Sequence, residues 1–383
     1  MTGLHHNSLK AIVEEAVKEG KMDPVLKDAS NIKFLYTVEH IHQLLEILER
    51  PKWSDIYKNV EVITINNLKG GTGKSTTTIN MATALALDLE LRARVLVIDL
   101  DPQGSLEKYT GHDLDFDASI LTSVDLMLGD REEGSVYQNY INQGLSHEDI
   151  VKGSLISTHL PNLKILPSHP DDDRYNEEIM INIIDELREN PDLNPNKFNS
   201  MLREKIIDVV KDDFDFIFID TTPQRNFLVK TALEACTGLL VPCTPHDMDW
   251  KATQKHIRNL ENVVINDIPD KGLRINWLKV IPTNLEKTFD RDKIIHNRMK
   301  NALGSALIKS PILQSHAFEV ASQQKVTVND IAGSTKLVPV KQLKSAKDSL
   351  ELSTEELLDV VRAAKLDNGE YIGESNVVNR GRV

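Results

Sequence analysis

The stretch VEVITINNLKGGTGKSTT, residues 60–77, decides the fold of this 383-residue chain. Residues 60–65 are mostly β-branched and predict a short buried strand. A glycine-rich turn follows, and after it apolar residues recur three or four positions apart, which places them on one face of a helix. These apolar residues are Ile79, Ala82, Ala86 and Leu89. A strand, a glycine loop and a helix in this order are typical of a phosphate-binding site.

The glycine loop predicts a site for the phosphate groups of a nucleotide. The first amide groups of a helix have no partner inside it and mark the positive end of its dipole, so they can hold an anion. The loop glycines allow positive φ and a close approach of the backbone to phosphate oxygens. Lys74 can reach the β- and γ-phosphates, and the Ser75 hydroxyl can bind Mg²⁺. The predicted nucleotide-binding residues of the loop are Lys69, Gly70, Gly71, Thr72, Gly73, Lys74, Ser75 and Thr76.

An ordinary glycine turn between a strand and a helix is the simpler alternative. The agreement of strand, glycines, Lys-Ser pair and helix argues against it.

One departure from the standard phosphate-loop pattern indicates a subfamily. The standard pattern has glycine at position 68, where this chain has Leu68, and a second lysine, Lys69, stands just before the glycines. The sequence KGGTGKS resembles the deviant P-loop of the ParA/MinD class of dimerising ATPases. In that class the early lysine reaches across a dimer interface to the partner's nucleotide, and the resemblance implies this role for Lys69. The spacing alone shows only a second cation near the phosphates.

Two later segments place acids at the ends of buried strands. RVLVIDLDPQG, residues 94–104, carries Asp99 and Asp101, and FDFIFIDTTP, residues 214–223, carries Asp220. Open α/β sheets bind ligands at the carboxyl ends of their strands. Two solvated acids at a strand end are the alternative for the first segment.

The same segments strengthen the family resemblance. The first resembles the second diagnostic segment of the ParA family, which implies that Asp101 positions or polarises the attacking water and that Asp99 supports Mg²⁺ or the water network. The second resembles Walker B, which implies that Asp220 accepts hydrogen bonds from Ser75 and from a Mg²⁺-bound water. The predicted catalytic residues are therefore Lys69, Lys74, Asp99 and Asp101, and the predicted metal ligands are Ser75, Asp99 and Asp220.

Further strands are predicted at residues 162–167, 238–242 and 277–282, with helical stretches between them. Strands that alternate with helices of this length predict an α/β fold, a P-loop NTPase with a mostly parallel twisted sheet flanked by helices. We expect this ATPase domain to span residues 59–365. The family resemblance places an adenine-contacting segment at Thr283 and Asn284.

Residues 1–58 predict a small N-terminal helical module. One apolar stripe runs through residues 9–17, and a second helix is expected to begin at Thr37 and to end before Pro51. Short helices before the ATPase domain resemble the helix-turn-helix extension of the larger plasmid-type ParA proteins. Residues 1–60 hold eight Lys/Arg and nine Asp/Glu, so no basic recognition helix stands out, and a dimerisation or packing arm is the alternative. Residues 366–383 predict a polar, flexible tail.

The composition fits a protein of the cytoplasm. Apolar residues make up 40% and charged residues 27% of the chain, and no run of about 18 apolar residues exists. The first ten residues lack the apolar centre of a secretory signal. The two cysteines, Cys236 and Cys243, argue against a disulfide framework or a zinc site. A net charge of −13 excludes a general polyanion binder, so any DNA contact needs a local basic patch or an assembly.

Such a patch is predicted near the carboxyl terminus. Four lysines occur there without an intervening acid: Lys336, Lys341, Lys344 and Lys347. They could contact phosphates non-specifically, and a solvated helix face is the alternative. Residues 315–319, SHAFE, resemble a family segment that usually carries arginines, but this chain has Gln314 and His316 in their places. Residues 171–173, DDD, are expected to be a solvated loop rather than a metal site.

The resemblance covers about residues 60–350 and implies a DNA-partition ATPase that uses ATP and Mg²⁺. Its ATP-bound homodimer would bind bulk DNA at the nucleoid, and a ParB-type centromere-binding partner would stimulate hydrolysis and release it. Operator DNA is a further candidate partner. The alternatives are a MinD-like membrane-associated ATPase, against which the lack of an amphipathic C-terminal helix argues, and a metabolic enzyme of the same superfamily, such as an amidoligase or a nitrogenase-type reductase.

Overall fold

The computed structural model describes residues 6–27, 34–104, 106–109, 120–132, 134–333 and 335–372. Its centre is a seven-stranded sheet in which all neighbouring strands are parallel except the pair of β5 and β6. In spatial order the strands are β5 (Ile156–Ser157), β6 (Leu163–Leu166), β4 (Val95–Leu100), β7 (Phe216–Thr221), β3 (Glu61–Ile65), β8 (Gly238–Cys243) and β9 (Trp277–Pro282). The predicted fold class is confirmed.

The strand register brings the predicted acids together. β3 lies between β7 and β8, and β7 lies between β3 and β4. Asp220 is opposite Ile65 on one side and opposite Asp99 on the other. The segment that follows β3 therefore enters the glycine loop directly beside two acidic strand ends, at the carboxyl edge of the sheet.

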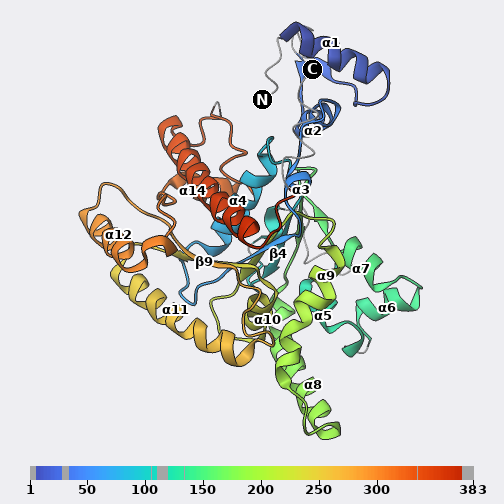
Figure 1. Cartoon of the computed structure of the whole chain (residues 1–383), viewed down its shortest axis with the longest axis vertical. Coiled ribbons are helices and arrows are strands. Elements are labelled where there is room, and N and C mark those ends of the chain that lie inside the picture. Colours follow the sequence, from blue (N-terminus) through green and yellow to red (C-terminus); the bar gives the residue numbers. More distant parts are fainter. Residues whose placement is uncertain are drawn as a thin grey trace.

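Helices cover both faces of the sheet because alternate strand residues point to opposite sides (Figure 1). On one face Ile63 and Val97 pack against α4 (Lys74–Leu87) and α14 (Val340–Asp367). On the other face Val62 and Ile98 pack with residues of the helices α5 (Ser123–Leu128), α8 (Tyr175–Glu189), α9 (Asp208–Val210) and α10 (Phe227–Ala235). Two longer helices, α11 (Asp247–Asp267) and α12 (Asp290–Leu303), pack against one face of β8 and β9.

Shorter helices complete the described chain. They are α6 (Val136–Asn142), α7 (His147–Gly153), α13 (His316–Gln323) and the short turns η1 (Glu107–Tyr109), η3 (Gly129–Arg131), η4 (Pro170–Arg174), η5 (Pro195–Ser200), η6 (Arg203–Ile207) and η7 (Gly304–Ala306).

The N-terminal module has a small core of its own, formed by Val13, Ala16, Met22 and Leu44. It contains α1 (His6–Lys18), a two-stranded hairpin of β1 (Leu26–Lys27) and β2 (Phe34–Leu35), and α2 (Val38–Ile47). Thr37 caps α2, because its side chain accepts a hydrogen bond from the backbone of His40. The sequence pattern did not predict the hairpin, whose two strands have only two residues each.

The segment after the module ties both ends of the described chain to the sheet. In α3 (Trp53–Ile56), Trp53 is buried, and its ring lies 4.8 Å from that of Phe216. Beyond α14 the chain returns to this segment, where Ile372 donates a backbone hydrogen bond to Ile56. Residues 366–372, which we expected to belong to a flexible tail, are held in place by α14 and by these contacts. Residues 373–383 lie outside the described chain.

Candidate nucleotide site

The glycine loop has the backbone shape of an anion cradle. α4 begins at Lys74, and Gly73 precedes it as the N-cap residue, with φ of 82°. Gly71 has φ of 75°, and a Cβ atom added there would meet nothing within 4 Å. Both angles lie in the left-handed region that favours glycine. The φ of Gly70 is not positive.

Lys74 is buried at the first position of α4 and exposes 7% of its surface. Burial lowers the pKa of its ammonium, while Asp220 and Asp101 oppose the shift. A buried cation at the positive end of a helix has an unfavourable surrounding unless an anion joins it. The arrangement therefore favours a bound anion in front of the loop.

Asp220 lies fully buried at the end of β7. Its Oδ1 accepts a hydrogen bond of 3.1 Å from the Thr78 hydroxyl, whereas Oδ2 is buried and has no hydrogen-bond partner among the described residues. Burial raises the pKa of this carboxyl to about 6, although the Ser75 hydroxyl and Lys74 lower it. A buried carboxylate oxygen without a partner fits a cation or a cation-bound water at this place.

Thr78 was not predicted as a site residue. It lies one helical turn after Lys74, so it faces the same side of α4, and this spacing was the available signal.

Asp99 organises the loop that follows β4. Its two carboxylate oxygens accept backbone hydrogen bonds of 3.0 Å from Asp101 and 3.2 Å from Leu106. Burial, followed by the neighbouring Asp220, raises the pKa of Asp99 well above its usual value. Asp99 thus lies beside the metal-site candidate Asp220, while both of its oxygens already accept hydrogen bonds from the loop.

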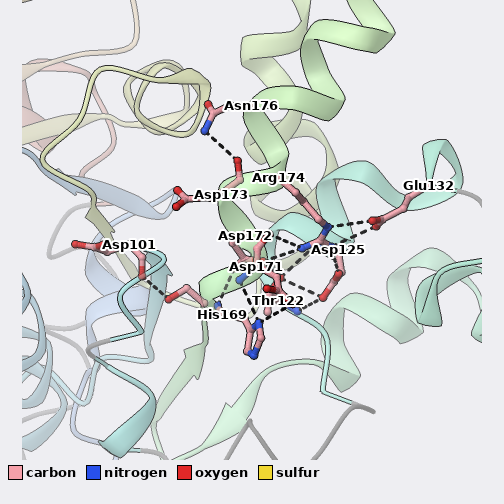
Figure 2. Close-up of polar contacts among 11 residues, drawn as sticks. Asp101, Thr122, Asp125, Glu132, His169, Asp171, Asp172, Asp173, Arg174 and Asn176 are labelled. Carbon is pink, nitrogen blue, oxygen red and sulfur yellow. Dashed lines mark hydrogen bonds and ion pairs between the residues drawn. The ribbon is translucent and has the colours of Figure 1, made fainter.

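Two hydrogen bonds hold Asp101 at the carboxyl edge. Its Oδ1 accepts a hydrogen bond of 3.2 Å from the backbone of Gln103, and its carbonyl oxygen accepts one of 2.7 Å from the Ser168 hydroxyl. Figure 2 shows this link between the Asp101 loop and the turn that begins at residue 168. Asp101 exposes 8% of its surface.

The predicted adenine segment contacts the phosphate loop itself. The Thr283 hydroxyl donates a hydrogen bond of 2.7 Å to the carbonyl of Thr72, and Thr283 is buried. Asn284 is exposed beside it and has a left-handed φ of 52°. Thr283 therefore stabilises the phosphate loop through the carbonyl of Thr72.

The second lysine of the loop lies apart from the first. The Lys69 ammonium is 3.7 Å from the carboxylate of Asp249 on α11, and 45% of the Lys69 side chain is exposed. The Asp249 carboxylate also accepts a hydrogen bond from Thr244. No sequence pattern had indicated Asp249, which is distant in sequence from the loop that it contacts.

The four C-terminal lysines do not form a uniform patch. Lys341 and Lys344 line a pocket of about 580 Å³, together with Lys287 and Lys309. Lys347 is different, because its ammonium donates hydrogen bonds of 3.0 and 2.9 Å to two backbone carbonyls. These two bonds hold the segment before α14, and a DNA contact by Lys347 stays a prediction. The fourth lysine, Lys336, is exposed.

The acidic cluster at residues 171–173 is only partly the solvated loop that we expected. Asp172 exposes 2% of its surface and accepts a hydrogen bond of 2.8 Å from the Thr122 hydroxyl. Its carboxylate is also 3.2 Å from the guanidinium of Arg174. Asp171 and Asp173 remain exposed. Hydrogen bonding to Thr122 and Arg174 makes the burial of one acid tolerable.

The described residues contain no group of three or more histidine, cysteine or acidic side chains that could hold a metal by themselves. The described helices also include none that is long and apolar enough to cross a membrane.

Comparisons with known proteins agree with this geometry. The plasmid partition protein A of Escherichia coli is 26% identical over 346 residues, which are 88% of this chain and 81% of that protein. A family model described as an AAA domain matches residues 60–271, more than half of the chain. The chain belongs to this family, as a ParA-type ATPase.

Solved structures show how widely the fold of this ParA-type ATPase is shared. A structure named partition protein covers 93% of the chain and is itself covered to 88%, with a TM-score of 0.66 and 24% identity. Cobyrinic acid a,c-diamide synthase from Mycobacterium smegmatis, solved with an ATP analogue and magnesium, covers 78% of the chain and is covered to 94%. Its TM-score is 0.56 and its identity 19%. At these identities the likeness concerns the fold alone.

Proposed function

We propose that this ParA-type ATPase is a DNA-partition protein, which binds ATP with Mg²⁺, associates with DNA as an ATP-bound homodimer and leaves it after hydrolysis. The observation that carries the nucleotide part is the buried Oδ2 of Asp220, which has no hydrogen-bond partner among the residues that the structure describes. Asp220 lies beside Ser75 and Lys74 at the amino end of α4. The relatives named above support the partition part.

Different groups of the site bind the phosphates of ATP and the Mg²⁺ ion. The first amides of α4 and the Lys74 ammonium bind phosphate oxygens. Ser75 would hold Mg²⁺ and Asp220 would accept a hydrogen bond from one of its waters, since Mg²⁺ is usually bound by few protein groups, phosphates and water. When bound, Mg²⁺ neutralises charge on the phosphates. The absence of a larger metal cluster among the described residues is compatible with such a site.

Hydrolysis then requires a positioned water. Asp101 orients that water, while the backbone bonds to Asp99 hold the loop that carries it. Lys69 supplies positive charge to the nucleotide of a partner subunit. Its half-exposed side chain forms a long ion pair with Asp249, which is weak enough for the lysine to turn away from Asp249 towards a partner subunit. Activity therefore depends on dimerisation.

DNA binding completes the cycle. Lys336, Lys341 and Lys344 contact backbone phosphates in the ATP-bound dimer, and a ParB-type partner stimulates hydrolysis. This cycle operates in the cytoplasm at the nucleoid.

The direct test measures binding to non-specific duplex DNA with ATP, with ADP and without nucleotide, at two salt concentrations. We expect binding that requires ATP and weakens steeply with salt. Equal affinity with ATP and without nucleotide would remove the proposed switch. Absence of DNA binding, combined with sedimentation on anionic liposomes, would favour a MinD-like membrane ATPase.

Replacing two lysines tests the proposed DNA surface. The double variant Lys341→Gln/Lys344→Gln should reduce ATP-dependent DNA affinity about tenfold and lower the slope of log affinity against log salt by about 2. Lys271→Gln, an exposed lysine beyond α11, is the matched control and should change neither. An unchanged salt slope in the double variant would exclude these lysines.

A further inference from the structure

The turn between β6 and α8 together with the first two residues of α8, residues 168–176, contacts both loops that carry the predicted reaction chemistry. At its first residue, Ser168 exposes 1% of its surface and donates a hydrogen bond of 2.7 Å to the carbonyl of Asp101. This carbonyl belongs to the residue that we expect to position the attacking water. The turn thus holds the Asp101 loop through its backbone and does not occupy the Asp101 carboxylate.

At its other end the turn holds the loop that follows Asp220. The Asn176 side-chain oxygen accepts a hydrogen bond of 3.0 Å from the backbone of Phe227, the first residue of α10. The chain between Asp220 and Phe227 is only six residues long, so a fixed start of α10 limits where this loop can move. One short segment therefore joins the two acidic loops at the carboxyl edge.

The middle of the turn is cross-linked by a cluster of charged residues around the buried Asp172, which Figure 2 shows. Asp172 accepts a hydrogen bond of 2.9 Å from the backbone of His169, and it also contacts Thr122 and Arg174. Arg174 in turn pairs at 3.0 Å with Glu132 and also pairs with Asp125 of α5. A segment held in this way transmits a displacement at one end to the other instead of absorbing it.

We propose that residues 168–176 are a positioning brace, which fixes Asp101 relative to the loop after Asp220 and so sets the geometry of the attacking water. The proposal rests on the proposed ATPase function, and it concerns residues that touch neither phosphate loop nor nucleotide. A displacement of about 1 Å in a reacting group can lower a rate about 100-fold, so a brace of this kind matters more to turnover than to binding.

A double-mutant cycle on ATP turnover tests the brace. Ser168→Ala removes the donor at one end, and Asn176→Ala removes the acceptor at the other. Each single variant should lower kcat about tenfold and leave KM for ATP within about twofold. If the two ends act through one brace, the kcat of the double variant should be close to that of either single variant, because the loss of one contact already frees the Asp101 loop. If the fold-loss of kcat in the double variant equals the product of the two single losses, the contacts act separately and the proposal is overturned.

Conservative variants separate positioning from folding. Ser168→Thr keeps a hydroxyl donor, and Asn176→Asp keeps an acceptor oxygen, so both should retain kcat within about threefold of the parent protein. Ser154→Ala is the matched control, since Ser154 is also a buried serine that donates to a carbonyl, that of Ile150, away from the carboxyl edge. Failure of both conservative variants to retain activity while remaining folded would contradict the proposal.

A second readout needs no ATPase activity. In the nucleotide-free protein, amide hydrogen exchange should become at least tenfold faster at Gln103 and Leu106 in Asn176→Ala, although Asn176 lies at the remote end of the brace. Unchanged exchange there would overturn the brace even if turnover falls. If the parent protein hydrolyses no ATP, the proposed function fails by itself, and the exchange measurement still decides whether the brace exists.

Discussion

Charged side chains are buried both at the amino ends of the central strands, here called the amino edge, and at their carboxyl ends, the carboxyl edge. The two places differ in whether the buried charges have partners. At the amino edge, Lys365 of α14 lies 3.4 Å from the carboxylate of Glu61 and 2.6 Å from that of Glu370. Its ammonium also donates to the carbonyls of Lys58 and Asn59. The other oxygen of Glu61 accepts a hydrogen bond of 3.0 Å from the indole of Trp277.

At the carboxyl edge the buried charges are left incomplete. One oxygen of Asp220 has no partner among the described residues, and burial shifts the pKa of Lys74, Asp99 and Asp220 towards their uncharged forms. Similar side chains thus serve two purposes. A satisfied buried cluster holds an element in place, whereas an unsatisfied one indicates where a charged ligand completes the structure.

Replacing the buried lysine of the carboxyl edge should have the largest effect. Lys74→Ala removes the cation that faces the phosphates, and we expect ATP turnover to fall at least about 1,000-fold. Release of ADP and equilibrium binding of a fluorescent ATP analogue measure this effect. Turnover within tenfold of the parent protein would place the phosphate site elsewhere.

Replacing the buried lysine of the amino edge should instead affect stability. Lys365→Met leaves Glu61 buried without its cation, which should lower the free energy of unfolding by about 3–5 kcal/mol. ATP turnover of the folded fraction should remain within about twofold. Urea unfolding followed by tryptophan fluorescence provides the measurement.

The double variant Lys365→Met/Glu61→Gln controls for the lost charge. It removes the unpaired carboxylate and retains an acceptor for the Trp277 indole, so it should recover part of the lost stability. A double variant less stable than Lys365→Met would contradict a buried ion pair at this edge.

The pH dependence of stability should report the burial of the Asp220 carboxyl. Its folded pKa of about 6 exceeds the usual value of 3.8, so its ionisation opposes folding. This penalty is absent below about pH 4, grows between pH 4 and 6, and is complete above. In the ligand-free protein with EDTA, Asp220→Asn should therefore gain roughly 2–3 kcal/mol over the parent protein on going from pH 4 to pH 7. A pH-independent difference would show that Asp220 already has a partner.

The exposed lysine of the carboxyl edge should have the smallest effect on stability. Because the Lys69–Asp249 pair is long and its lysine is half exposed, Lys69→Ala should change the free energy of unfolding by less than about 1 kcal/mol. ATP turnover in the presence of a stimulating partner should nevertheless be lost. Normal stimulated turnover in Lys69→Ala would refute its action on a partner subunit.

The sequence predicted those parts of the fold and site that depend on contiguous patterns. The glycine loop, the acidic strand ends and the alternation of strands and helices each lie within short stretches, and the sheet confirms the fold class that they indicate. The strand register then brings Asp99 and Asp220 together, as the common carboxyl edge of parallel strands implies.

Contacts between distant segments could not be predicted in this way. Asp249, Ser168 and Asn176 have no motif of their own, and each acquires its place only when the sheet brings its loop to the carboxyl edge. The hydrogen bonds of Lys347 could not be predicted for the same reason, because its carbonyl partners lie in the preceding loop and do not enter a count of charges.

The strand order has a consequence for folding during synthesis on the ribosome. The strand β3, which begins the phosphate loop, pairs only with β7 and β8, and these strands are made more than 150 residues later. Until residue 221 has emerged, β3 has no strand with which to pair. The nucleotide site, which includes Asp220, is completed only after β7 has been made, so the nucleotide cannot assist the earlier steps of folding.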